Sequence, residues 1–391
     1  MVCHEPLKIV YCNPSLHIAG GIERVLSVKA NYFAENLGYE VHIVITDGKK
    51  KEPFFDLHPS IKVHQLDINY DEWLPPYRRF FCFLQKRKLH IKRLNKLLAQ
   101  IQPDITILLV RREVSFVHRM TDSSIKIAEN HIDKNRYLTS INPLLAKYVP
   151  HFLLEYWKAQ YIKKVKSLDR FVVLTSEDKQ SWDELKNVIV IPNPLTFLPD
   201  KISLCTSKQV IAVGRYERQK GFDMLISVWK KVTMKYPDWI LRIFGDGSLR
   251  GELELQVIQE GITNNCFLDF PVKNIADKYA ESSISVLSSR FEGFGLVIIE
   301  AMCCGLPVVS FECPCGPRDI IRDQEDGILV EKGNVEKMEQ SILRLIENEE
   351  ERRQMGKNAL QNVQRYHMEN IVVLWKELFE ELLQHNTQLS K

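Results

Sequence analysis

Short apolar runs alternate with longer amphipathic stretches along most of the chain. Several runs contain no polar residue, as expected for strands that helices cover on both faces. We predict strands at Lys8–Cys12, Val41–Thr46, Ile61–Leu66, Ile105–Val110, Ile125–Glu129, Phe171–Thr175, Val188–Ile191, Val210–Val213, Ile240–Phe244, Cys266–Asp269, Ile284–Ser288, Val308–Phe311 and Ile328–Glu331. Helical periods separate most of these runs, which predicts parallel α/β structure built from βαβ units.

A proline-rich stretch divides this pattern into two series. Pro192-Asn193-Pro194 is followed by Pro199-Asp200, and prolines restrict the backbone and remove hydrogen-bond donors. We therefore predict a Rossmann-like domain over residues 1–191, a linker over 192–208 and a second doubly wound domain over 209–369. We expect the two domains to face each other across a cleft, because ligands of such sheets bind beyond the carboxyl ends of the strands.

Composition supports a globular protein of this kind. The chain has 391 residues, of which 45% are hydrophobic and 26% charged, which excludes a disordered, collagenous or coiled-coil chain. It has no apolar run long enough to span a membrane, and its first residues lack the apolar core of a signal peptide. We expect a cytoplasmic location.

The cysteines and the charges are both unevenly placed. Nine cysteines are scattered without a Cys-x-x-Cys pair, so we expect reduced, mostly buried thiols rather than a zinc site. Residues 1–190 hold 29 Lys/Arg and 21 Asp/Glu, a net charge of +8, whereas the remainder carries −5. This asymmetry suggests different partners for the two domains.

Two groups of polar residues in the second half follow predicted strands. Gly214-Arg215 ends one strand, and Lys220-Gly221 precedes the next helix, so the Arg and the Lys suit a diphosphate. The alternative is two solvated basic side chains. Glu292 precedes a very apolar helix, Leu296 to Cys304, and Glu300 lies within it. The loop between Glu292 and that helix is Gly293, Phe294 and Gly295.

A carboxylate buried in so apolar a helix costs several kcal/mol unless it is paired. The two hydroxyls of a ribose are a suitable partner for Glu300, and the free amides at the helix start suit a phosphate. The alternative is that one glutamate is a surface residue and the other belongs to an ion pair.

The first half offers two weaker signals. Gly20-Gly21 lies after the first strand and opens a helix, where backbone amides can approach an anion, although simple turn chemistry explains it equally well. Glu129-Asn130-His131 ends another strand, and His131 is either a sugar ligand or only a satisfied polar residue. The glycines from Gly245 to Gly251 have the wrong spacing for a dinucleotide fingerprint.

With these motifs the chain resembles the family-4 retaining glycosyltransferases of the GT-B fold, from Gly20-Gly21 to the C-terminal helices. The most specific part is the pair of glutamates eight positions apart, Glu292 and Glu300. Gly214-Arg215 with Lys220-Gly221, Pro192-Asn193 and the region from Gly316-Pro317 to Asp326-Gly327 are also typical of the family.

The resemblance implies a role for each residue of the second domain. Arg215 and Lys220 would bind the donor diphosphate, and Gly214, Gly293 and Leu296 belong to the same donor site. Glu300 would hold the donor ribose. Glu292, with the amides near Phe294 and Gly295, would hold the donor sugar.

The resemblance also implies roles in the first domain. Gly20 and Gly21 would line the diphosphate and acceptor side, and His131 would contact the donor sugar near the reacting carbon. A C-terminal helix, about residues 370–388, would return to the first domain; Ile371–Leu383 has the required length and period.

The implied activity is retaining transfer of a sugar from a nucleotide sugar, UDP being favoured, to a glycan acceptor carried on a polyprenyl diphosphate. The segment from Cys313 to Arg318 resembles those of bacterial surface-polysaccharide transferases. The chain has no Asp-x-Asp pair, so we expect neither a metal nor another cofactor. The alternatives are a phosphorylase or sugar-nucleotide epimerase of the same architecture and a non-catalytic nucleotide-sugar-binding subunit.

Two stretches of the first half combine basic and aromatic residues. Tyr77 to Lys96 contains eight Lys/Arg and no acid, with aromatic and leucine side chains interleaved at 80–84. Tyr148 to Arg170 is similar. The hypothesis is peripheral attachment to the anionic inner face of a membrane. The alternative is that these aromatic side chains point into the core; nucleic-acid binding is disfavoured because the chain has no recognised module for it.

Overall fold

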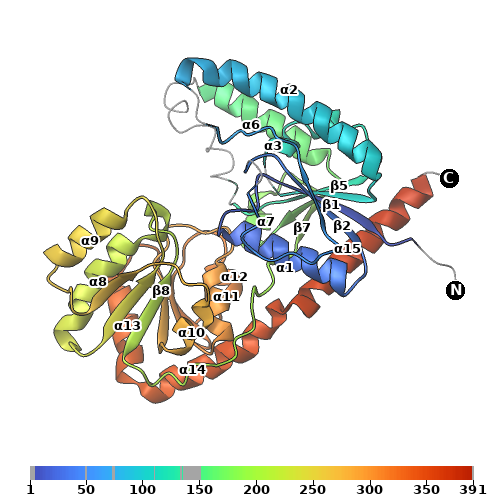
Figure 1. Cartoon of the computed structure of the whole chain (residues 1–391). Helices are drawn as coiled ribbons and strands as arrows, with labels where there is room; N and C mark the ends of the chain where they lie inside the picture. Colours follow the sequence, from blue (N-terminus) through green and yellow to red (C-terminus); the bar gives the residue numbers. More distant parts are fainter. Residues whose placement is uncertain are drawn as a thin grey trace. The chain divides into compact units, whose positions relative to one another are not determined.

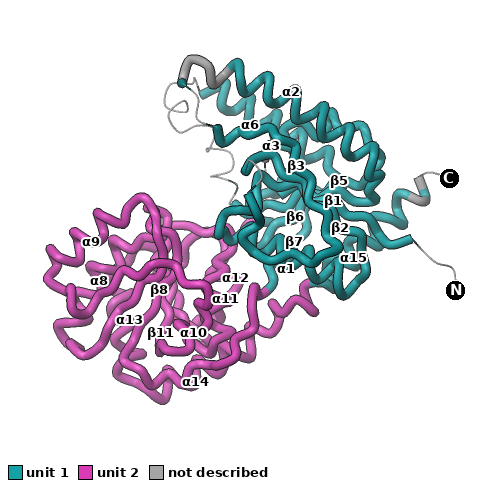
Figure 2. Tube along the Cα trace, viewed as in Figure 1, with its two compact units in different colours: residues 1–174, 179–194, 372–391 teal, residues 175–178, 195–371 magenta. Residues whose placement is uncertain are grey.

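The computed structural model describes residues 5–48, 51–72, 75–109, 111–132, 134 and 151–389, without the side chains of 76–80, 111, 387 and 389. The chain forms two compact units (Figure 2). Unit 1 consists of residues 1–174, 179–194 and 372–391, and unit 2 of residues 175–178 and 195–371.

Unit 1 is built on a parallel sheet of seven strands in its described part. Their order is β3 (Lys62–Gln65), β2 (Glu40–Ile45), β1 (Lys8–Asn13), β4 (Ile105–Leu108), β5 (Ile125–Glu129), β6 (Arg170–Val173) and β7 (Val188–Val190). The strand order reverses between β1 and β4, and such a switch point is where open α/β sheets bind ligands.

Helices cover both faces of this sheet, which explains why its central strands are largely apolar, whereas the edge strand β3 is polar and partly exposed. In β1, Val10 and Cys12 belong to a core cluster with residues of the helices α2 (Pro76–Ile101) and α6 (His151–Lys166). Figure 1 shows α1 (Gly21–Glu35) and α15 (Met368–Leu389) on the opposite side of the sheet. The ring of Phe33 on α1 meets Phe379 on α15 edge-on at 5.8 Å.

Unit 2 repeats this architecture with a parallel sheet of six strands. The order is β10 (Cys266–Asp269), β9 (Ile240–Phe244), β8 (Gln209–Val213), β11 (Ile284–Leu287), β12 (Val308–Phe311) and β13 (Gly327–Val330). The helical elements are η2 (Arg218–Lys220), α8 (Phe222–Lys235), α9 (Arg250–Gln259), α10 (Ile275–Ala280), α11 (Leu296–Cys303), α12 (Pro317–Ile320), α13 (Val335–Glu347), α14 (Glu349–Asn362) and η3 (Val363–Tyr366). Here the strand order reverses between β8 and β11.

The two doubly wound sheets confirm the predicted fold class, and each predicted strand is present within two residues of its expected ends; Val110 lies outside the described residues. The division between the units falls after Pro194, within the predicted linker. Residues 195–208 pack with unit 2, where Leu195 N–H donates to the Tyr366 carbonyl and Ser203 N–H to that of Cys304, both at 2.8 Å. The C-terminal helix begins at Met368, and its residues from Val372 onward pack in unit 1.

Two further expectations concern cysteines and membrane spans. The eight cysteines in the described part are free thiols, and seven of them are buried; Cys3 lies outside it. Among the helices of the described residues, none is both long and apolar enough to cross a bilayer.

Candidate functional site

The predicted donor-site residues of unit 2 gather where its strand order reverses. The loop after β8 carries Gly214 and Arg215 and continues through η2 to Lys220. The loop after β11 carries Glu292 and leads into α11. Because β8 and β11 are neighbouring parallel strands, both loops leave the same edge of the sheet at its switch point.

Lys220 and Glu292 form a largely buried ion pair at this edge. Lys220 Nζ lies 2.7 Å from Glu292 Oε1, and the two side chains are only 14% and 7% exposed. The Ser289 hydroxyl donates to the same carboxylate oxygen at 2.6 Å. Removing one member of such a pair leaves a buried charge without its partner, at a cost of about 3–5 kcal/mol.

Two glycines allow this lysine to reach its position. A Cβ on Gly214 would lie 3.0–3.1 Å from the Lys220 side-chain carbons, so the lysine stem crosses the bare backbone of Gly214. Gly221 has a φ of +64°, and a Cβ there would lie 2.1 Å from the Ser288 carbonyl oxygen. The turn is fixed further because the Ser288 hydroxyl donates to the Lys220 carbonyl at 2.8 Å.

Arg215 differs from Lys220 in being exposed. Its side chain forms no hydrogen bond or ion pair with any residue that the structure describes, although its charge contributes, after the hydrogen bonds from Ser248, to lowering the pKa of Glu217. An arginine at a sheet switch point with all its donors available is suited to bidentate contact with a phosphate.

Glu300 is buried in α11, as its apolar neighbours predict, and is 5% exposed. The Thr196 hydroxyl donates to Glu300 Oε1 at 2.9 Å. The contact of Thr196 with Glu300 was not predictable from the sequence, because 104 positions separate the two residues and no spacing rule joins them. The hydroxyl shows that this carboxylate accepts hydrogen bonds from alcohols, which is the interaction expected of a ribose.

The loop before α11 is held by close backbone contact. Gly295 has a φ of +95° and caps the helix, whose first turn presents amide groups at its N-terminus. Gly316 lies directly against the Phe294 backbone, where a Cβ would come within 1.8 Å of the Phe294 carbonyl oxygen. Gly293 to Leu296 therefore follow Glu292 in one fixed turn beside the Lys220 pair.

In unit 1 the two glycines expected to bind a ligand open α1. Gly20 is the N-cap residue, and Gly21 is exposed. The Glu23 carboxylate lies over Gly20, 2.1 Å from where a Cβ would stand. The absence of a side chain at Gly20 therefore leaves room for the Glu23 carboxylate of the same helix, a role that the sequence did not predict.

His131 follows β5 at the carboxyl edge of the same sheet, as expected. Its side chain is 6% exposed, and Nε2 lies 3.3 Å from Glu129 Oε1. Glu129 is also paired with Lys29 of α1, whose Nζ lies 2.5 and 2.6 Å from the two carboxylate oxygens. From the sequence, Glu129 was noted only as part of Glu129-Asn130-His131, and the pairing of Glu129 with Lys29 was not predicted.

A second polar cluster in unit 1 was also missed. Arg112, after β4, pairs with Asp47, after β2, at 2.6 Å and stacks 4.3 Å from the Tyr70 ring. Beneath it, Glu113 Oε1 lies 3.5 Å from His90 Nε2, and both side chains are buried. No motif links these residues in sequence; only the parallel order of the strands brings them together.

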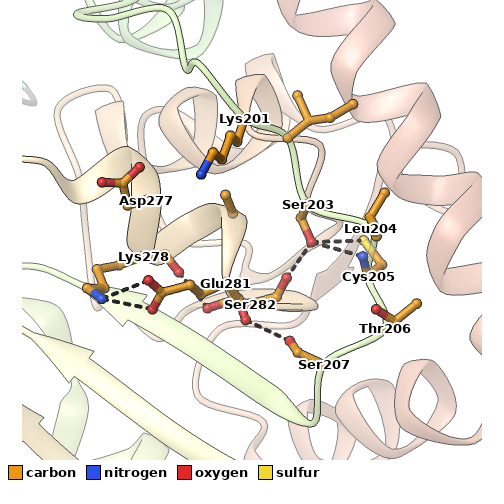
Figure 3. Close-up of a pocket in the computed structure, with 12 residues that line it drawn as sticks. Lys201, Ser203, Leu204, Cys205, Thr206, Ser207, Asp277, Lys278, Glu281 and Ser282 are labelled. Atoms are coloured by element: carbon orange, nitrogen blue, oxygen red, sulfur yellow. Dashed lines mark hydrogen bonds and ion pairs between the residues drawn. The ribbon is translucent and has the colours of Figure 1, made fainter.

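Among the described residues, the predicted site residues do not form a metal-binding cluster and do not line the cavity found in unit 2. The described residues contain no group of three or more His, Cys, Asp or Glu that could hold a metal ion. A cavity of about 510 Å³ lies between residues 201–207 and 277–282 of unit 2 (Figure 3). These segments precede β8 and β11, so the cavity is at the amino edge of the sheet and contains none of the predicted site residues.

Comparison with known proteins identifies the family. Residues 200–362 match the family described as glycosyl transferases group 1. An uncharacterized glycosyltransferase of Haemophilus influenzae is 30% identical over 377 residues, which covers 94% of this chain and 99% of that protein. The chain belongs to the group 1 glycosyltransferases.

Two further proteins resemble this glycosyltransferase. In Campylobacter jejuni, N-acetylgalactosamine-N,N'-diacetylbacillosaminyl-diphospho-undecaprenol 4-alpha-N-acetylgalactosaminyltransferase is 26% identical over 343 residues, or 86% of this chain and 89% of that one. The structure of a TarM mutant from S. aureus, in complex with fondaparinux, alpha-GlcNAc-glycerol and UDP, gives a TM-score of 0.73 at 16% identity. It covers 95% of this chain and 99% of TarM, which confirms the GT-B fold.

Proposed function

We propose that this glycosyltransferase takes a sugar from a nucleotide sugar, UDP being the favoured nucleotide, and transfers it to a glycan acceptor. The observation that carries the proposal is the buried Lys220–Glu292 pair with Glu300 at the switch point of unit 2. A cation–carboxylate pair, the N-terminus of α11 that follows it and a second carboxylate on that helix match the diphosphate, sugar and ribose hydroxyls of such a donor. The UDP in the TarM complex supports the choice of nucleotide.

The charges suit the bond that breaks. Cleavage of a sugar–phosphate bond leaves negative charge on the diphosphate, which Arg215, Lys220 and the first amides of α11 would stabilise. These groups supply the charge that a metal supplies elsewhere, so we propose a metal-independent reaction. We also propose that the anomeric configuration is retained, with the leaving phosphate accepting the acceptor proton on the same face of the sugar.

The acceptor of the sugar is proposed to be a lipid-linked glycan. The Campylobacter relative is named for an acceptor on diphospho-undecaprenol. We propose a comparable polyprenyl-diphosphate-linked glycan as the acceptor here, in bacterial polysaccharide or glycoconjugate biosynthesis.

A nucleotide-release assay over a panel of UDP- and GDP-sugars tests the donor site. Because Arg215 forms no hydrogen bond or ion pair in the described part of the chain, Arg215→Ala leaves stability nearly unchanged and should lower kcat about 10²–10³-fold. The matched control is Arg353→Ala, an exposed arginine on α14, which should behave as the wild type. Equal activity of the two variants would contradict the assignment.

A non-catalytic nucleotide-sugar-binding subunit is the second candidate, because the same pocket chemistry serves binding alone. The two functions differ in one observable. The enzyme releases UDP faster when acceptor is present, whereas the binding subunit is stabilised by the nucleotide sugar without releasing UDP. In Glu292→Ala protein that thermal unfolding shows to be folded despite the unpaired Lys220, release should be abolished in the first case, whereas in the second nucleotide-sugar binding should weaken.

The surface formed by α2 and α6 supports attachment to a membrane. The two helices run side by side (Figure 1), and burial together with the nearby Arg87 and Arg119 lowers the pKa of Lys164. Near the helix starts, Phe81, Phe152 and Tyr156 are 70%, 69% and 57% exposed. The side chains of 76–80 and residues 148–150 lie outside the described part.

The basic residues of α2 form a stripe beside these aromatic side chains. Lys88, Lys92 and Lys96 are exposed and follow one another at four-residue spacing, which places them on one face of the helix. Basic residues near an anionic bilayer contribute about 1 kcal/mol each. We propose that this surface holds the enzyme at the cytoplasmic face of the membrane, next to a lipid-linked acceptor.

Vesicle flotation tests the membrane surface. At low salt the wild type should float with vesicles containing phosphatidylglycerol and remain unbound with phosphatidylcholine alone. Phe81→Ser with Phe152→Ser should reduce flotation, whereas Leu255→Ser with Ile258→Ser, which alters two exposed side chains of α9, should not. Absence of flotation in the wild type, or equal loss in both double variants, would reject the surface.

A further inference from the structure

A buried ion pair joins α1 and β5 of unit 1 next to His131. The Lys29 and Glu129 side chains are each 1% exposed, and both carboxylate oxygens contact the ammonium group. Lys29 Nζ also lies 4.7 Å from the ring centre of Trp375 on α15 and 5.9 Å from that of Tyr11 on β1. The pair is therefore almost fully buried, with two aromatic rings close to its ammonium group.

The carboxylate stays charged in this setting. Burial alone would raise the pKa of Glu129, but Lys29 and then His131 outweigh it and lower that pKa to about 2. A buried ion pair is seldom more stabilising than apolar residues of the same size. The pair is thus poorly explained by stability alone, and the group beside it, His131, points to another role.

The neighbouring carboxylate restricts what His131 can do. A charged carboxylate only accepts hydrogen bonds, so the nitrogen that faces it must carry the proton. That nitrogen is Nε2, which lies 3.3 Å from Glu129 Oε1 as an ion-pair contact and forms no hydrogen bond in the described part of the chain. In the neutral ring Nδ1 then has a lone pair and accepts a hydrogen bond from a donor such as an alcohol.

The position of His131 is suited to such a contact. It stands at the carboxyl edge of the sheet, two residues beyond Glu129, and lines a cavity of about 150 Å³ whose other lining residues are Glu129, Asn130 and mostly apolar side chains. Glu129 lies on one side of the ring, and residues of α1, β4, β5, α6 and β6 line the cavity that the ring borders.

We propose that Glu129, anchored by Lys29, is a positioning residue that fixes the orientation and the Nε2–H tautomer of His131, so that Nδ1 accepts a hydrogen bond from a sugar hydroxyl. The tautomer is a property of the unliganded chain, whereas the contact with the sugar rests on the proposed transferase function. Glu129 itself does not touch the substrate in this scheme.

A charge-neutral double variant separates positioning from folding. Lys29→Met with Glu129→Gln removes both charges and avoids leaving one of them unpaired. The matched control is Lys126→Met with Asp122→Asn, which removes another largely buried pair, 2.8 Å apart, whose lysine lies on the same strand β5. Circular dichroism and thermal unfolding establish that both variants fold.

Nitrogen-15 NMR of the imidazole gives the readout that a purely structural role would not change. The signals of His131 are assigned by their loss in His131→Ala. In the wild type and in the control, Nε2 should carry the proton. In the Lys29/Glu129 variant the tautomers should mix, and kcat for UDP release should fall about 10–100-fold with a smaller change in KM.

A neutral His131 ring that carries its proton on Nδ1 in the wild type would overturn the proposal. This result does not depend on whether the double variant folds. An unchanged tautomer in a folded Lys29/Glu129 variant would also overturn it, as would an equal loss of kcat in the control. If no nucleotide sugar is turned over by the wild type, the proposed function fails, and the tautomer still decides the positioning role.

Discussion

His90 and Glu113 show how much a buried position changes an ionisable residue. Burial raises the pKa of Glu113 to about 7, and burial together with Arg112 lowers the pKa of His90 to about 4. Both groups are therefore neutral near pH 6 in the folded chain, where a protonated carboxyl and a neutral ring 3.5 Å apart can share one proton.

The two shifts give opposite dependences of stability on pH. The folded state binds the Glu113 proton more tightly than the unfolded state, so this contribution falls as pH rises from about 4.5 to 7. The folded state disfavours the His90 proton, so that contribution rises with pH from about 4 to 6.5. In the wild type the two slopes offset each other over their shared range.

Removing one of the two groups should therefore make the pH dependence of the free energy of unfolding visible. Glu113→Gln should make the free energy of unfolding rise between pH 4 and 6.5, and His90→Gln should make it fall between pH 4.5 and 7. Urea unfolding at half-unit pH intervals measures both. Parallel pH profiles of the two variants would contradict the pKa shifts.

Thr196 offers a test of the ribose contact. Thr196→Val leaves Glu300 Oε1 without the hydroxyl that donates to it, which should cost about 1–3 kcal/mol of stability. If ribose hydroxyls occupy the same oxygen, UDP should restore part of that loss and raise the melting temperature more than in the wild type. Thr263→Val, at an exposed turn, is the control. An equal UDP shift in all three proteins would exclude the contact.

At the scale of elements, the turn at η2 decides whether Lys220 reaches Glu292. Gly221→Ala places a Cβ 2.1 Å from the Ser288 carbonyl oxygen at a φ of +64°, so the turn must move. We expect a loss of about 1–3 kcal/mol and weaker UDP binding, measured by thermal unfolding and calorimetry. Gly251→Ala is the control, because it lies in α9 with open space around its Cβ position and should be neutral or stabilising. Normal UDP affinity in Gly221→Ala would contradict this role.

Most elements of the fold were predictable from sequence, because buried parallel strands leave uninterrupted apolar runs. Val308–Phe311 and Ile240–Phe244 were placed to the residue, and the ends of Ile61–Leu66 moved inward by one residue because this strand lies at the sheet edge. The closeness of Lys220 and Glu292 was predictable because their motifs follow neighbouring strands, whereas their role in donor binding stays a prediction. Thr196, Lys29 and Arg112 were not predictable, because strand order, not spacing, brings their partners near.

At the scale of the whole molecule, the chain repeats one architecture with two kinds of surface. The first half carries net +8 and the basic stripe of α2, whereas the second half carries −5 and holds the predicted donor residues, among them the largely buried Lys220 and the exposed Arg215. This charge separation is consistent with the proposed donor binding in unit 2 and with a proposed anionic acceptor or membrane that contacts unit 1. It can be read from the sequence alone.

Hydrogen–deuterium exchange with and without UDP is the measurement that tests the central claim most directly. Saturating UDP should slow exchange at the amides of Gly214 to Gly221 and of Gly293 to Ile298, the two loops that leave β8 and β11. At 100 times its dissociation constant the nucleotide should also add about 2.7 kcal/mol of stability. Protection confined to other segments, with these two loops unchanged, would contradict the account.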